Sequence, residues 1–462
     1  MFDSKIYSRR RRRLIKKVNR GLILILGNVD SPINYPGNFY PFRQDSSFLY
    51  FFGLDHPGLA GVIDAETGEE FLYGDDAILE DIIWMGLQTP LKEKAVKVGV
   101  SNTGSFMQLF EKILETNRQG RKIHFLPPYR AENKLLLQRL LGIHSSKQQE
   151  YVSFKLIKAI VDLRSVKEDD EIKEIETACA VGYKMHVAAM KMAHPGTWEQ
   201  AIAGAIEGIA ISGGGMLSFP TILTMNGQAL HKHDHSNFLE EGRLLLVDAG
   251  AESRSHYASD HTRTMPVGGK FSRQNREIYN LVLAANNKAI ELIRPGETYL
   301  NIHLEVCKVI AGGLKELGLM KGNIDEAVAA GAHALFMPHG LGHMMGLDVH
   351  DMEDLGQVFV GYDDEVRPSD QFGTANLRLG RRLQSGFVLT VEPGVYFIPE
   401  LIEKWQNEKM HVEFINYEKL KCYRKFGGIR LEDGIQVTKD GCRILGDRIP
   451  ITPEEVEKYM ER

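Results

Sequence analysis

Long apolar runs, paired cysteines and an excess of one charge are all absent from this 462-residue sequence. No stretch reaches the ~18 apolar residues of a membrane-spanning helix, and the first residues include no apolar core of a secretory signal. The four cysteines lie far apart without a CxxC pair, which argues against a disulfide framework and thiolate-bound zinc. The net charge of −5 gives no reason to expect a nucleic acid partner. We therefore expect a cytoplasmic protein that binds neither membranes nor nucleic acids.

What is present is an ordinary globular composition, with 43% hydrophobic residues. The first part of the chain combines helix and strand signals, which predicts an N-terminal α/β domain over residues 1–163. The arginine run 9–13 predicts a helix with a solvated basic face. Residues 22–26, 48–52, 60–63 and 96–100 are expected to form strands.

The second part, residues 164–462, contains an internal echo. A long helix is expected to begin near Asp169 and to end at a Pro-Gly turn. Residues 194–206 resemble residues 294–306, and the apolar run 244–250 resembles the run 387–394. A duplicated half is the simplest explanation, and it would place an acidic residue at matching strand ends. Coincidence remains the alternative.

Acidic residues and histidines gather where apolar strands end. Asp248 and Glu392 each close an apolar run, Asp260 follows Asp248 by 12 residues, and Glu432 lies in the last strand signal. A hairpin between Asp248 and Asp260 would bring both carboxylates to one place. Ten of the 16 histidines fall within residues 231–350. Acids within apolar runs need compensating charge, and a metal pair would supply it.

A glycine-rich segment, 338–351, adds His339, His343 and His350. One imidazole with four carboxylates is an oxygen-rich ligand set, which suits Mn²⁺ or Fe²⁺ better than structural zinc. Two divalent ions would balance four carboxylates in charge. Water held between such ions ionises near neutral pH and can attack a carbonyl. The alternative is that one or two of these histidines are satisfied core residues.

Several segments are similar to the signatures of one known family. They are VDAG with YASDHTRT, HGLGHMMGLDVHD, TVEPG, GIRLEDG and, near the start, FRQDSSFLYFFG. They resemble the pita-bread metallopeptidases, and most of all the aminopeptidase P (Xaa-Pro aminopeptidase) branch. The resemblance implies an α/β N-terminal domain and a C-terminal pseudo-twofold pita-bread α+β domain.

The resemblance also implies a role for each matching metal ligand. Asp248 would bind one of two divalent ions, most plausibly Mn²⁺, through both carboxylate oxygens. Asp260 and Glu432 would bridge the two ions. His343 and Glu392 would complete the ligand set, and Glu392 would also carry a proton during catalysis.

Further residues match substrate-side positions of that family. His350 matches a histidine that stabilises the transition state, and His339 matches a histidine beside the penultimate proline. His231 matches a third substrate-side histidine, and Arg430 matches an arginine that orients an acid. Trp84 resembles an aromatic residue near the active site of the family's oligomers.

Three departures from the family pattern stand out. The acid that commonly precedes the early aromatic run is replaced by Ser47, with Asp45 two residues earlier, so the anchor for the substrate amine is open. The hairpin between the two aspartates is longer, which suggests a longer turn or bulge at residues 254–256. A separate zinc site is an alternative use of three histidines at strand spacing, His231, His233 and His235.

The sequence therefore predicts a hydrolase that removes the N-terminal residue from peptides with proline in second position. A homo-oligomer, dimeric or tetrameric, is expected. The alternatives are a prolidase, which cleaves only Xaa-Pro dipeptides, and a non-catalytic peptide-binding module on the same fold.

Overall fold

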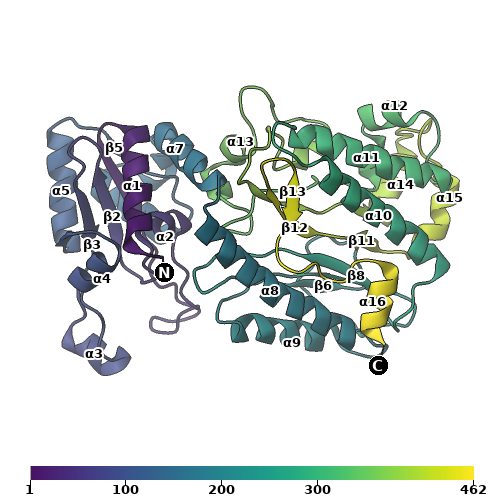
Figure 1. The fold of residues 1–462 in the computed structure, drawn as a ribbon, viewed down its shortest axis with the longest axis horizontal. Helices are drawn as coiled ribbons and strands as arrows, with labels where there is room; N and C mark the ends of the chain where they lie inside the picture. Colours follow the sequence, from purple (N-terminus) through teal and green to yellow (C-terminus); the bar gives the residue numbers. More distant parts are fainter. Residues whose placement is uncertain (1, 462) are drawn as a thin grey trace. The chain divides into compact units, whose positions relative to one another are not determined.

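The computed structural model describes residues 2–461 and divides the chain into two compact units. The first comprises residues 1–164 with 354–359, and the second comprises residues 165–353 with 360–462. Among the described residues, no helix has the length and apolar character to cross a membrane. Figure 1 shows the elements of each unit as a ribbon.

The first unit is built on a five-stranded mixed sheet in the order β4-β3-β2-β1-β5. The apolar run Leu22–Leu26 forms the inner strand β1, which lies antiparallel to β2 and parallel to β5. Strand β3 pairs antiparallel with β2 and parallel with β4. The other bounds are β2 Ala60–Asp64, β3 Glu70–Tyr73, β4 Asn102–Gly104 and β5 Ile123–His124.

Helices accompany this sheet, and two of them replace expected strands. Residues 48–52 belong to helix α2, Ser46–Phe52, because the Asp45 side chain caps it by accepting from the Phe48 backbone N–H. Residues 96–100 cover the end of α4 and a turn rather than a strand. The helix bounds are α1 Ser4–Val18, α3 Leu79–Met85, α4 Leu91–Lys97, α5 Phe106–Arg118, α6 Ala131–Leu141 and α7 Phe154–Ser165.

The arginine run 9–13 lies on α1 as expected, but the prediction of a solvated basic face was wrong for two of its members. Arg10 and Arg11 are buried. The Arg10 guanidinium lies over the Tyr50 ring at 4.0 Å. Arg11 forms an ion pair with Glu70 at 2.8 Å. Helix periodicity therefore turns part of a basic run inward, where aromatic rings, carbonyls and an acid hold it.

The second unit repeats a helix pair and a three-stranded sheet, which agrees with the internal echo. The first copy has helices α8 and α9 with the sheet β6-β7-β8, and the second has α10 and α11 with the sheet β13-β12-β9. In the ribbon, strands lie between the two helix pairs (Figure 1). The bounds are α8 Asp169–Met192, α9 Glu199–Ser212, β6 Ile222–Thr224, β7 Leu244–Asp248, β8 Thr262–Pro266, α10 Arg273–Leu292, α11 Tyr299–Glu316, β9 Val388–Val391, β12 Asp433–Val437 and β13 Cys442–Ile444.

Both copies join their helices through a Pro-Gly turn. Gly196 and Gly296 have φ values of 81° and 89°, a left-handed conformation that glycine adopts without strain. Thr298 then caps α11 through its side chain. The remaining helices and strands of this unit are α12 Ile324–Ala329, β10 Gly394–Tyr396, α14 Pro399–Asn407, α15 Tyr417–Leu420, β11 Gly428–Arg430 and α16 Pro453–Met460. Helix α13, Gln357–Val360, lies mostly in the first unit.

Candidate metal centre

The first two acids lie at one end of a hairpin. Asp248 is the last residue of β7, where it pairs with Thr262 of β8, and Asp260 lies two residues before that partner. The connection turns through His256, whose φ is 66°, and the bridge between Glu252 and Ala258 shapes it. A turn therefore lies at residues 254–255, and its greater length relative to the family stays a prediction. It returns the chain so that both aspartates come from the same end of the hairpin.

The other two acids come from the second sheet. Glu392 directly follows β9, and Glu432 directly precedes β12. These strands are antiparallel, and Asp433 pairs with Val391. Glu392 and Glu432 are thus adjacent to the ends of one ladder, just as the aspartates are in the first sheet.

His343 completes this group, and its hydrogen bonds fix its tautomer. Its Nδ1 lies 3.0 Å from the carbonyl oxygen of Met344, which can only accept, so Nδ1 carries the proton. Its Nε2 faces carboxylates, 3.3 Å from Asp260 Oδ2 and 3.8 Å from Glu392 Oε1. An imidazole held by a carbonyl oxygen through one nitrogen, with its other nitrogen among carboxylates, has the arrangement of a metal ligand.

The buried carboxylates of the cluster place negative charges close together, which favours binding of a cation. One ligand atom each from Asp260, His343 and Glu432 lies within 4.8 Å of the others, and all three residues are buried. Burial raises the pKa of Asp260 well above its ordinary value, and Asp248 and Glu392 raise it further. Burial and Asp260 likewise raise the pKa of Glu432. Oδ1 of Asp248 and Oδ1 of Asp260 are buried without a hydrogen-bond partner among the described residues, so the oxygen-rich set fits divalent ions.

Arg430 holds the outer side of the cluster. Its guanidinium donates to Asp248 Oδ2 at 2.5 Å, to Thr262 Oγ1 at 3.0 Å and to Tyr396 Oη at 3.0 Å. Thr262 Oγ1 in turn donates to Glu432 Oε2 at 2.7 Å. Burial opposes the charge of Arg430, but Tyr396 and the surrounding carboxylates raise its pKa well above its ordinary value. Arg430 thus orients one acid directly and a second through the threonine.

His339 is neutral and belongs to a chain of hydrogen bonds that begins at Arg430. Tyr396 Oη accepts from Arg430 and lies 2.9 Å from His339 Nε2, so the phenol donates to this nitrogen. His339 Nδ1 lies 2.8 Å from the Gly340 carbonyl oxygen, to which it donates. Burial lowers the pKa of His339 to about 3, and Arg430 contributes. Its ring is 4.0 Å from Glu392 at the closest ion-pair atoms.

His350 packs against the proposed ligand His343, with ring centroids 3.9 Å apart. Its Nδ1 lies 3.2 Å from Glu353 Oε2, which also accepts from Arg378 at 2.5 Å. Burial and His343 lower the pKa of His350 to about 4. Burial opposes ionisation of Glu353, but His350 and Arg378 lower its pKa to about 2. Glu353 and Arg378 were not predicted from the sequence, although an acid three residues after a histidine was a signal for Glu353.

The other two predicted substrate-side residues, His231 and Trp84, are less buried than the residues of the carboxylate cluster. His231 lies in a partly exposed loop, and Arg430, Asp248 and His350 act on its charge, with burial the largest cause of its lowered pKa. Trp84 belongs to α3 in the first unit and is 79% exposed. Its contact with substrate remains a prediction.

The separate zinc site does not gain support from the three histidines. His233 Nδ1 lies 3.4 Å from the Thr221 carbonyl oxygen, and His235 Nδ1 lies 3.0 Å from that of Leu223. The two residues follow strand spacing, but their rings bond carbonyl oxygens two residues apart, one just before β6 and one within it. Within residues 2–461, the groups of potential metal ligands include none of these histidines.

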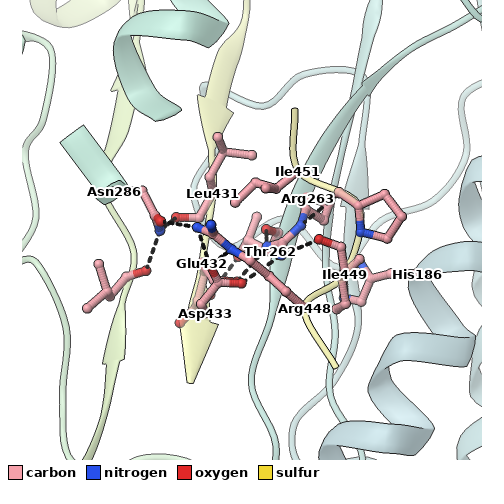
Figure 2. A network of polar contacts seen from close by, with 12 residues as sticks. His186, Thr262, Arg263, Asn286, Leu431, Glu432, Asp433, Arg448, Ile449 and Ile451 are labelled. Carbon is pink, nitrogen blue, oxygen red and sulfur yellow. Dashed lines mark hydrogen bonds and ion pairs between the residues drawn. The ribbon is translucent and has the colours of Figure 1, made fainter. Parts of the chain in front are cut away.

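A second buried arginine supports Glu432 from behind. Arg263 donates to the carbonyl oxygen of Glu432 at 2.7 Å and to Asp433 Oδ1 at 2.6 Å (Figure 2). Arg448 reaches the other oxygen of Asp433 at 3.0 Å and Asn286 Oδ1 at 2.8 Å. This network was not predicted from the sequence, although an arginine within a buried strand was a signal for it. It fixes the backbone from which Glu432 projects.

The fold and the carboxylate site together define a class, the metal-dependent hydrolases. The sequence profile of metallopeptidase family M24 matches residues 173–439, and that of the aminopeptidase P N-terminal domain matches residues 7–124. The chain belongs to metallopeptidase family M24, with the two-domain fold of aminopeptidase P. The predicted family resemblance, fold class and hydrolase activity are confirmed.

Known relatives span nearly the whole chain. Xaa-Pro aminopeptidase of Escherichia coli K12 is 30% identical over 465 residues, covering 98% of this chain and 97% of that protein. Xaa-Pro dipeptidase of Homo sapiens is 30% identical over 427 residues, covering 91% and 84%. A solved structure of E. coli aminopeptidase P in complex with substrate has a TM-score of 0.81 at 28% identity and covers 100% of this chain and 98% of that one. A zinc-substituted form in complex with product gives the same values.

Proposed function

We propose that this protein is an Xaa-Pro aminopeptidase, which removes the N-terminal residue from peptides that carry proline in second position. The proposal rests above all on one observation, the convergence of carboxylates and the His343 imidazole in a buried cluster. Arg430 pairs with Asp248 there, but Oδ1 of Asp248 and Oδ1 of Asp260 have no hydrogen-bond partner among the described residues. Two divalent ions, for which we propose Mn²⁺, would be held by five residues, Asp248, Asp260, His343, Glu392 and Glu432. When bound, the ions supply a Lewis acid and lower the pKa of water.

Glu392 is the acid best suited to move a proton. Its side chain is 20% exposed, against 6% for Asp260 and 10% for Asp248. Its two oxygens point toward different imidazoles, His343 and His339. A carboxylate that reaches both the cluster and the more open side can take a proton there and release it to a leaving amine.

The imidazoles prepare the substrate side. His339 Nε2 already accepts from Tyr396, so His339 offers a neutral ring face beside the cluster and presents no N–H from that nitrogen to the substrate. His350 has an ionised partner, Glu353, that would favour positive charge on its ring when negative charge develops nearby. His231, at the partly exposed loop, is proposed to contact the peptide, and Trp84 to contact substrate in an oligomer.

The prolidase is the second candidate, because the human Xaa-Pro dipeptidase and the E. coli Xaa-Pro aminopeptidase are equally identical to this chain. Turnover of Ala-Pro-Ala against Ala-Pro, with Mn²⁺ added, separates them. We expect preference for the tripeptide. A strong preference for the dipeptide would assign a prolidase, and binding without turnover of either would favour a peptide-binding module.

Further parts of the proposal concern context. We propose that residues 1–163 form a domain that limits substrate length, that residues 164–462 carry the chemistry, and that the protein is a cytoplasmic dimer or tetramer without membrane or nucleic acid partners. The amine anchor stays open, since Asp45 caps α2 and Ser47 Oγ accepts from Arg164 at 3.1 Å.

A further inference from the structure

A second group of potential metal ligands lies apart from the carboxylates. His303 and Cys307 stand one turn apart on α11, and His333 lies on the 3-10 helix Ala332–Leu335. One ligand atom of each lies within 4.8 Å of the others. All three residues are fully buried, and none belongs to the carboxylate centre. The scattered cysteines without a CxxC pair predicted no thiolate-bound metal, because one cysteine with two histidines leaves no such pattern.

The spacing of the donor atoms suits a metal ion. Cys307 Sγ lies 3.6 Å from His303 Nε2. A zinc ion with sulfur at about 2.3 Å and nitrogen at about 2.05 Å in tetrahedral geometry holds those two atoms about 3.6 Å apart. Residues four apart on a helix share one face, so α11 presents both donors toward the 3-10 helix.

His333 supplies the observation that requires a ligand. Both of its ring nitrogens are buried without a hydrogen-bond partner among the described residues. A neutral imidazole carries one N–H and one lone pair, and leaving both unpaired in the interior is unfavourable. Burial lowers the pKa of His333 to about 4 and that of His303 to about 3, so both rings are neutral and have a lone pair to donate.

We propose that His303, Cys307 and His333 bind a thiophilic cation of the Zn²⁺ class, in a site distinct from the carboxylate centre. On binding, the Cys307 thiol releases its proton to solvent and Sγ bonds to the ion. Thiolate with two imidazoles is a soft ligand set, in contrast to the oxygen-rich centre. His339 follows His333 by six residues. An ion bound to His333 would therefore hold the start of the segment that leads to His339 in place. This proposal does not depend on the peptidase specificity.

Co²⁺ is the probe that distinguishes the two centres. Cobalt bound to thiolate absorbs strongly in the near ultraviolet through charge transfer, and a centre of carboxylates and imidazole cannot produce that band. We expect the band in cobalt-loaded wild type, its loss in Cys307→Ser with one metal equivalent fewer per chain, and its retention in Cys179→Ser, a matched buried thiol. Stoichiometric Zn²⁺ should bleach it.

A second variant keeps the proposal testable if Cys307→Ser fails to fold. His333→Phe keeps a ring of similar size and removes both unpaired nitrogens. We expect this variant to fold, to lack the band and to lose the rise in melting temperature that Zn²⁺ gives the wild type. A wild type that shows no thiolate band at full loading, a band that persists in Cys307→Ser, or a band that Zn²⁺ does not bleach would overturn the site.

Discussion

Replacing Arg263 with methionine removes the cation at the centre of the network behind Glu432. In the folded protein Arg263 is fully buried and donates to the side chain of Asp433 and to the carbonyl oxygens of Thr262, Glu432, Ile449 and Pro450. Methionine fills much of the volume and supplies none of these donors. Asp433, only 1% exposed, then keeps Arg448 as its remaining cationic partner in this network.

We expect Arg263→Met to lower the free energy of unfolding because it removes one partner of the buried ion pair between Arg263 and Asp433. Removing one partner of a buried, hydrogen-bonded ion pair destabilises by ~3–5 kcal/mol, because the other charge stays desolvated. The control Arg448→Met removes a side chain that is 30% exposed and leaves Asp433 bonded to Arg263. We expect that control to cost about 1 kcal/mol or less.

The dependence on pH gives a second signature of the same pair. Burial would raise the pKa of Asp433, but Arg263 and Arg448 lower it below the ordinary value of 3.8. A lowered folded pKa stabilises the protein above the unfolded value, and that stability is lost as pH falls through the folded pKa. The difference in unfolding free energy between wild type and Arg263→Met should therefore become smaller as the pH falls through the folded pKa of Asp433.

The assay is denaturant unfolding followed by tryptophan fluorescence in a Trp84→Phe background. Trp198 and Trp405 then report on the second unit alone, which avoids mixing two transitions. If Arg263→Met lowers the unfolding free energy at pH 7 by less than about 1 kcal/mol, no more than Arg448→Met does, the reasoning is refuted. The buried Asp433 carboxylate would then not depend on Arg263 for its stability.

Two further predictions concern the support of the metal centre. Thr262→Val removes the hydroxyl that donates to Glu432, and we expect the metal affinity measured by titration to fall ~10–100-fold. Thr262→Ser keeps a hydroxyl and should keep the affinity. An equal loss of affinity in both variants would contradict a role for the hydroxyl. Gly342→Ala would drive a Cβ into the Thr390 carbonyl oxygen, so we expect lower melting temperature and metal content. Gly434→Ala is the control, since its Cβ meets only a flexible methionine methyl at 3.1 Å; similar losses in both variants would contradict the steric account.

Much of the geometry of the candidate site was predictable because the proposed ligands lie at strand ends. Asp248 and Glu392 each close an apolar run, and the hairpin spacing places Asp260 near Asp248, so topology brings distant acids together. The duplicated helix pair also followed from the Pro-Gly echo. The family resemblance supplied what spacing could not, namely the choice of His343 as the histidine that joins those acids and the role of each ligand.

Other features depend on contacts that a linear pattern does not carry. The aromatic run 48–52 has strand composition, yet a cap by Asp45 makes it helical. The arginines of α1 look solvated until the aromatic and acidic partners from distant segments are known. Arg263 and the buried His333 likewise acquire meaning only from residues far away in the sequence.

The most direct test of the central claim is the metal content of Asp260→Asn compared with wild type, after dialysis against Mn²⁺, with Xaa-Pro peptide turnover measured on the same samples. Asp234→Asn, at an exposed aspartate, is the matched control. We predict that Asp260→Asn keeps its circular dichroism spectrum but loses bound metal and turnover, while the control keeps both. Full metal content and unchanged turnover in Asp260→Asn would contradict the assignment of this carboxylate as a metal ligand.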